Sequence, residues 1–494
     1  MSRLDPITLQ VMLGALRAAC EEMGVVLVRS AHSANVKERR DASTALFDAD
    51  GQMVMQAEHI PVHLGAMPSA VEAVLGEDHG RGDAWILNDP YRGGTHLPDI
   101  TVISPLFAAG EHVGFAASRA HHADVGAPEP GSMPADSRTL DDEGVVIEPA
   151  RLTPALLREL AGKMRNPRQR EADLRAQLAA NRTGGERLEA LVERYGLDTL
   201  RAAMTETLDY AERRTRARIA ELDDGRREAR DLLEAADEDL ELQLVAEVRG
   251  DELTLDFGGS AGQHEGNLNC PLPVTLSACY FALRVLTDPD VPPSAGAYRP
   301  LTVKAPEGSL LNARPPAAVA AGNVETSSRV ADLVLAAFGR ALGQGTMNNL
   351  TLGNDDFTYY ETLGGGQGAC PDADGPSAVH VAMSNTLNTP VEALELEFPL
   401  RAVEYLVRRG SGGAGRHRGG DGVVRELEAL DDMRYSLISE RRRHAPPGAD
   451  GGESGAPGRN LLNGDELPAK SSGELRAGDQ LRIETPGGGG HGRP

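Results

Sequence analysis

The sequence has few of the features that mark secreted, membrane-bound or nucleic-acid-binding proteins. Only four of its 494 residues are cysteines, and none forms a Cys-x-x-Cys pair, so we expect reduced, mostly buried thiols rather than a disulfide scaffold. No apolar run approaches roughly 18 residues, and the first residues lack the basic and apolar segments of a signal peptide; a soluble, cytoplasmic protein is expected. The net charge of −24 disfavours nucleic acid and anionic membranes as partners, because phosphate binding requires clustered cations.

Hydrophobic periodicity divides the chain into four regions of a multidomain, mixed α+β protein. In residues 1–150, an amphipathic helix within 5–35 precedes short apolar runs broken by Gly, Pro, Asn and Asp, and Asp-Ala-Asp-Gly at 48–51 is typical of a hairpin turn. Residues 151–240 carry a charged helical pattern, and residues 241–400 mix alternating segments with two helical ones. Residues 401–494 contain short strands between Gly-rich turns, which predicts a β-rich end.

The densest group of reactive side chains lies between residues 58 and 124. It comprises Glu58 and His59, then Asn88-Asp-Pro-Tyr-Arg-Gly-Gly-Thr-His96-Leu-Pro-Asp99, then Arg119-Ala-His121-His122-Ala-Asp124. Imidazoles and carboxylates are the ligands that Zn²⁺, Mn²⁺ or Fe²⁺ take, and a short His-x-x-Asp loop can direct both side chains to one centre. The strand expected before His121 places His121 and His122 on opposite faces, so only one of them should bind. Capping aspartates and ordinary hydrogen-bonded histidines are an equally good explanation of the spacing alone.

Other polar clusters have structural explanations that need no ligand. The charged run from Lys37 to Asp41 is typical of a solvated turn before a strand, and Thr326 and Ser327 fit helix N-caps. Gly364–Gly368 and the four glycines at 487–490 predict tight turns with positive φ, because neither matches a P-loop or dinucleotide fingerprint. Nothing indicates an ATP site, and no motif supports a covalent serine or cysteine mechanism.

Several long motifs together resemble the hydantoinase B/oxoprolinase family. They include KERRDASTALFDADG, NDPYRGGTHLPDI, RAHHADVG, GNVETSSRVADLVLAAFG, YYETLGGGQGA, SNTLNTPVE and the terminal TPGGGGHG. They follow the family's order from about residue 5 to residue 492, so the resemblance covers essentially the whole chain.

The resemblance implies one subunit of an enzyme that opens cyclic amides at the expense of ATP. It implies an A-type ATPase partner that binds ATP and Mg²⁺, an α2β2 assembly, and a divalent metal (Mn, Zn or Fe) held by Glu58, His96, Asp99 and His121. We expect Asp99 or Asp41 to act as general base and Asp124 to orient His121, and His122 stays among the candidate catalytic residues. An ATP-dependent ketone carboxylase and a non-catalytic scaffold subunit are the alternatives.

Overall fold

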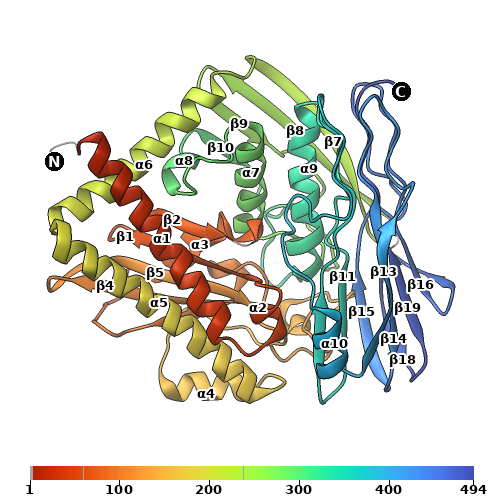
Figure 1. Ribbon diagram of the computed structural model, residues 1–494, viewed down its shortest axis with the longest axis horizontal. Helices are drawn as coiled ribbons and strands as arrows, with labels where there is room; N and C mark the ends of the chain where they lie inside the picture. Colours follow the sequence, from red (N-terminus) through yellow and green to blue (C-terminus); the bar gives the residue numbers. More distant parts are fainter. Residues whose placement is uncertain (1–3, 59, 237) are drawn as a thin grey trace.

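The structure is a computed structural model that describes residues 4–58, 60–236 and 238–494, without the side chain of Glu58. Its N-terminal part is a six-stranded antiparallel sheet in the order β2-β1-β5-β4-β3-β6 (Figure 1). The strands are β1 (Ala42–Asp48), β2 (Met53–Glu58), β3 (Trp85–Leu87), β4 (Asp99–Ala108), β5 (Glu111–His121) and β6 (Ala150–Arg151). The predicted hairpin turn at 48–51 is confirmed between β1 and β2, with Gly51 at φ 77°.

Helices cover both faces of this sheet and divide its side chains into two cores. The outer face packs against α1 (Pro6–Ser30), which confirms the predicted amphipathic helix, and against α5 (Pro167–Tyr195). The inner face packs toward α3 (Ala66–Glu72) and α7 (Leu272–Leu286). Because side chains alternate along a strand, Ala116 and Ala120 of β5 belong to the outer core and Phe115 and Ala117 to the inner one.

The middle of the chain adds three helices and a second sheet. The helices α4 (Pro154–Gly162), α5 and α6 (Leu197–Ile219) fit the predicted helical stretch. Beyond them the prediction is wrong, because β7 (Gly225–Glu234) begins inside residues 151–240. Its Arg, Glu, Ala and Leu residues favour a helix locally, but pairing with β8 over its whole length makes it a strand. The sheet runs β10-β9-β8-β7, with β8 (Asp239–Arg249), β9 (Glu252–Asp256) and β10 (Leu301–Lys304). Short α8 (Ala295–Tyr298) packs on α6, and α9 (Ser327–Ala337) packs on β7 and β8.

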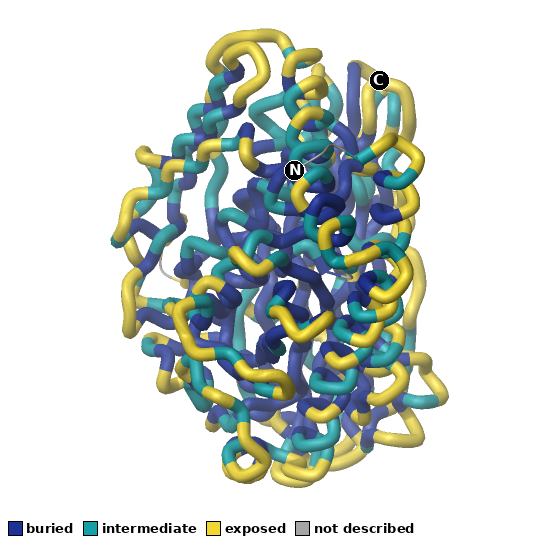
Figure 2. The backbone as a smooth tube through the Cα atoms, turned by 90° about the vertical axis from the view of Figure 1, so that its left-hand side faces the viewer, coloured by how far each residue is buried: buried dark blue, intermediate teal, exposed yellow. Residues whose placement is uncertain are grey.

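Two facing sheets confirm the predicted β-rich end and enclose a third core. One runs β12-β11-β15-β18 and the other β13-β14-β19-β16-β17. Their elements are β11 (Asn349–Gly353), β12 (Thr358–Glu361), α10 (Val391–Glu397), β13 (Leu400–Arg408), β14 (Gly422–Ala429), β15 (Met433–Ile438), β16 (Arg459–Leu462), β17 (Asp465–Leu467), β18 (Lys470–Leu475) and β19 (Gln480–Glu484). The protein is therefore α+β, as predicted, and its buried segments gather in the middle of the molecule (Figure 2). No described helix is long and apolar enough to cross a membrane.

The glycine-rich segments do not form the predicted positive-φ turns. None of the glycines at 364–368 or 487–490 has a positive φ. They lie extended against other backbone segments: Gly488 N donates to Gly420 O at 2.9 Å, and Gly413 N donates to Gly488 O at 2.8 Å. A Cβ on Gly366 would lie 2.1 Å from Gly420 O. A side chain does not fit at these positions because neighbouring backbone segments approach closely, and not because the backbone has a positive φ.

Helix α9 also starts differently from the prediction. A π-helical turn at Gly322–Thr326 leads directly into α9, and Thr326 makes no side-chain cap. Its hydroxyl donates to Leu268 O at 2.6 Å, and that of Ser327 donates to Asn323 O at 2.6 Å. The two residues therefore lie inside a continuous helix that tertiary packing extends toward the N-terminus.

Candidate metal centre

Three side chains predicted as metal ligands meet at one end of the six-stranded sheet. Asp99 is the first residue of β4 and pairs directly with His121, the last residue of β5. His96 comes from the turn just before β4. All three side chains are almost completely buried, with at most 3% exposed.

The donor atoms form a small triangle. His96 Nε2 lies 3.1 Å from Asp99 Oδ1, His121 Nδ1 lies 3.2 Å from the same oxygen, and the two ring nitrogens are 3.2 Å apart. One cation bonded to N and O ligands at about 2.0–2.2 Å, at angles near or above 90°, separates neighbouring donors by about 3 Å. The residues present thus fit a divalent metal in both donor type and spacing.

The electrostatics favour the protonation states that ligands need. Burial opposes ionisation of Asp99, but His96 and the hydrogen bonds from His121 and His63 outweigh it and hold the pKa of Asp99 well below its usual value. Burial lowers the pKa of His121, against the opposing effect of Asp99 and Asp41. Asp99 is therefore a carboxylate and His121 a neutral imidazole near neutral pH, and these are the forms that bind metal.

Side chains around the triangle fix its geometry. Thr95 Oγ1 donates to Asp99 Oδ2 at 2.7 Å, and His63 Nε2 lies 3.4 Å from that oxygen. The other ring nitrogen of His63 lies 2.9 Å from Ser43 Oγ on β1. Such contacts around a metal site hold its ligands in one orientation.

The C-terminal half closes the centre from the other side. The ring of Tyr360 on β12 stacks on His121 with centroids 4.4 Å apart and planes at 15°. The guanidinium of Arg39, which follows α2 (Ala34–Lys37), lies 4.6 Å from the Tyr360 ring centroid and donates to Tyr360 O at 2.6 Å. The centre therefore lies where residues far apart in the sequence come together.

The chain matches known proteins over nearly its whole length. The sequence profile of the hydantoinase B/oxoprolinase family matches residues 5–494. This chain belongs to that family.

Several similar proteins carry related enzyme names. A 5-oxoprolinase of Dictyostelium discoideum is 39% identical over all of this chain and 41% of its own length, so the chain spans about two fifths of that relative. A Pseudomonas protein provisionally named as the B-type component of a D-/L-hydantoinase is 31% identical over all of this chain and 91% of its own length. The crystal structure of ATP-dependent caprolactamase from Pseudomonas jessenii superposes with a TM-score of 0.92 at 29% identity, over all of this chain and 93% of that one.

Of the two remaining predicted residues of this hydantoinase B/oxoprolinase chain, Asp41 lies beside the triangle. Asp41 is buried beside β5, and its backbone carbonyl accepts the N–H of His121 at 3.0 Å. Asp41 and Asp99 thus flank His121 on either side. The backbone of Glu58 pairs with Ser43 at the end of β2, but the Glu58 side chain and His59 lie outside the described residues.

The structure does not bring His122 and Asp124 into the cluster. His122 points to the outer face of the sheet, where its Nε2 lies 3.0 Å from Gln177 Oε1 on α5. Asp124 accepts hydrogen bonds from Gly126 N and from Gly131 N at 2.8 and 3.0 Å, and pairs with Arg165 Nη1 at 2.9 Å. Asp124 therefore stabilises the loop after β5 rather than orienting His121, which corrects the sequence-based assignment.

Two residues of the site, His63 and Tyr360, were not predicted from the sequence. His63 lies within the same QAEHIPVHLG stretch as Glu58, so its spacing offered a weak signal. Tyr360 lies 239 positions after His121 in the sequence, and no local pattern connects the two.

Proposed function

We propose that this chain is the B-type subunit of an ATP-dependent hydrolase that opens cyclic amides such as hydantoins, oxoproline or lactams. The observation that carries the proposal is the buried His96, Asp99 and His121 triangle. It lies in a chain whose relatives are named oxoprolinase, hydantoinase and caprolactamase. Ring amides resist hydrolysis because of resonance, and phosphorylation of the amide oxygen makes the ring carbon electrophilic.

An A-type ATPase partner is part of the proposal. The Dictyostelium 5-oxoprolinase is matched over only 41% of its length, whereas the Pseudomonas relative named as a B-type hydantoinase component is matched over 91%. The remainder of the longer relative corresponds, in this proposal, to a separate subunit that binds ATP and Mg²⁺. That subunit transfers the terminal phosphoryl group of ATP to the amide oxygen and releases ADP. Water then adds to the ring carbon at the site of this chain, and the ring C–N bond breaks as its nitrogen takes a proton. Hydrolysis of the resulting acyl phosphate releases phosphate and the open-chain acid.

The residues of this chain have distinct proposed roles. His96, Asp99 and His121 would hold a divalent ion (Mn, Zn or Fe), and that ion would supply Lewis acidity at the site. Asp99 is engaged through both carboxylate oxygens, so it is a poor general base. Asp41, on the other side of His121, is the proposed base that takes a proton from the attacking water.

The test combines metal analysis with ring opening by the complex with the A-type partner. We compare three proteins: wild type, the double variant His96→Ala/Asp99→Ala, and the control His417→Ala. The His417 side chain pairs with Asp374 at 3.6 Å, outside the cluster. Metal content is measured by ICP-MS, and ATP-dependent opening is measured for hydantoin, 5-oxoproline and caprolactam. We expect near-stoichiometric metal and normal turnover in wild type and in the control. The double variant should lose metal content and turnover, each by at least about 100-fold, because the ligands act together with the metal.

Asp41→Asn separates the base from the ligands in the same assay. It should keep the metal and lose kcat by about 100-fold or more. Unchanged turnover of an intact complex that contains the double variant would show that the cluster is structural and the chain a scaffold.

A further inference from the structure

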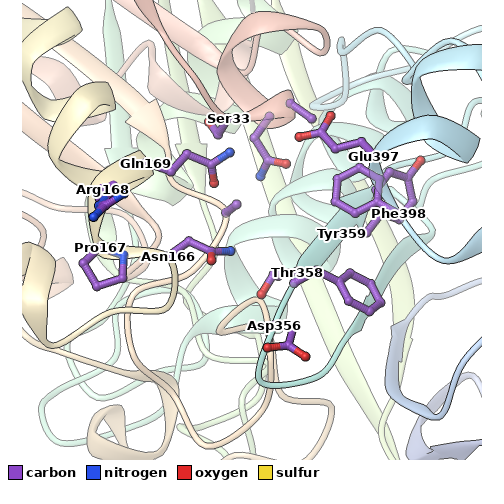
Figure 3. Close-up of a pocket in the computed structure, with 14 residues that line it drawn as sticks. Ser33, Asn166, Pro167, Arg168, Gln169, Asp356, Thr358, Tyr359, Glu397 and Phe398 are labelled. Atoms are coloured by element: carbon purple, nitrogen blue, oxygen red, sulfur yellow. The ribbon is translucent and has the colours of Figure 1, made fainter.

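A pocket of about 570 Å³ lies between the N-terminal and C-terminal halves of the chain (Figure 3). Residues 33–35, 166–169, 356–359 and 397–398 line it, together with Ala123. Figure 3 shows Gln169 and Asn166 on one side of the opening and Tyr359 and Phe398 on the other. The volume falls in the range of about 300–1,000 Å³ that is usual for small-molecule sites.

Three of these segments continue directly into the metal centre. Ala123 lies two residues after His121. Thr358 shares a face of β12 with Tyr360, whose ring stacks on His121. The carbonyl of Asn35 accepts the N–H of Asp41 at 3.1 Å. The pocket and the metal centre are therefore built from the same segments of the chain.

The pocket is built with polar groups that nothing in the described structure satisfies. Asn35 is 2% exposed and its Nδ2 has no hydrogen-bond partner among the described residues; the same holds for Oγ1 of Thr358, which is 8% exposed. A buried donor without a partner is costly, so such groups point to a ligand. The aromatic rings of Phe357, Tyr359 and Phe398 pack together beside them, with centroids 5.1 and 5.9 Å apart.

We infer that this pocket holds the ring of the cyclic amide, with the ring against the aromatic side chains and the amide edge at Asn35 and Thr358. The inference rests on the proposed function and adds a recognition site to it. In a small ring the amide is held cis, so C=O and N–H lie on one edge. The carboxamide of Asn35 also presents a donor and an acceptor on one edge, and the hydroxyl of Thr358 can do either. An open-chain amide, which is trans, cannot pair in this way.

The test uses the complex with its partner subunit and two conservative variants on separate elements. Asn35→Leu and Thr358→Val keep the side-chain volume and remove the hydrogen-bonding groups. The control, Gln10→Leu, removes a carboxamide from a different pocket that is lined by α1. Binding of hydantoin, 5-oxoproline and caprolactam without ATP is measured by calorimetry, alongside KM, kcat and metal content. We expect Asn35→Leu to raise Kd and KM about tenfold for the preferred ring, with Thr358→Val in the same direction, and wild-type metal content in all variants.

The outcomes separate the recognition site from the reaction. If wild type opens a ring and both variants bind and open it like Gln10→Leu, the pocket inference is wrong and the proposed function stands. If wild type binds a ring amide, the variants lose that binding, and no ring is opened, the pocket inference stands and the hydrolase proposal fails. Equal binding of N-methylacetamide, an open-chain trans amide, and of the ring amides would overturn the cis-amide assignment.

Discussion

His122 lies one residue beyond His121, a candidate metal ligand, yet its environment is that of a core side chain. Burial, and next the charge of Arg170, lower its pKa to about 4, against about 6.5 in the unfolded chain. Between those values the unfolded state binds more protons, so stability is full above pH 6.5 and falls as the pH drops toward 4, by about 3 kcal/mol at most. We expect His122→Gln to remove this dependence in urea unfolding between pH 4 and 7.5, and to keep the metal and the turnover of wild type. Parallel stability curves for the two proteins would contradict a buried neutral imidazole.

At the scale of elements, the glycine-rich segments act as close-packed backbone layers. A Cβ on Gly488 would lie 2.0 Å from Gln367 O, which is backbone and cannot move aside cheaply. We expect Gly488→Ala to destabilise the fold by about 1–3 kcal/mol or more, measured as a shift in the urea midpoint. Gly162→Ala on α4 is the matched control: a Cβ there meets nothing within 4 Å, and Ala in a helix stabilises by up to about 1 kcal/mol. Equal midpoints for the two variants would show that the glycine layers tolerate side chains.

At the scale of the whole molecule, buried charges join the second sheet to the C-terminal sheets. The fully buried carboxylate of Glu440 accepts from Lys470 Nζ on β18 at 2.5 Å and from Arg329 Nη2 on α9 at 3.3 Å. We expect Glu440→Gln to cost roughly 3–5 kcal/mol in unfolding free energy, because it leaves buried cations uncompensated. The exposed pair of Glu111 and Arg201, 2.6 Å apart, is the control, and Glu111→Gln should cost about 0–1 kcal/mol. Similar losses for both variants would indicate that the buried network is not what holds these parts together.

The sequence by itself determined the α+β class, the helix α1 and three side chains of the candidate metal centre. These are local properties: periodicity sets which face of a helix or strand is buried, and His-x-x-Asp places two ligands within one turn. The alternation of side chains on β5 also predicted that only one of His121 and His122 belongs to the site. Asp41 was named as a possible base with the family resemblance, but its charged run was predicted to be a solvated turn, and the structure instead buries Asp41 with 2% exposed.

Only the tertiary structure decided which distant residues complete the site. Tyr360 and His63 reach Asp99 and His121 through contacts between separate elements, and Asp124 turns away because Arg165 and two backbone amides hold its carboxylate. Strand β7 and the glycine layers were predicted wrongly because pairing with distant backbone overrode local propensity. Local sequence fixes the direction of a side chain relative to its own element, but only packing between elements fixes what that side chain meets.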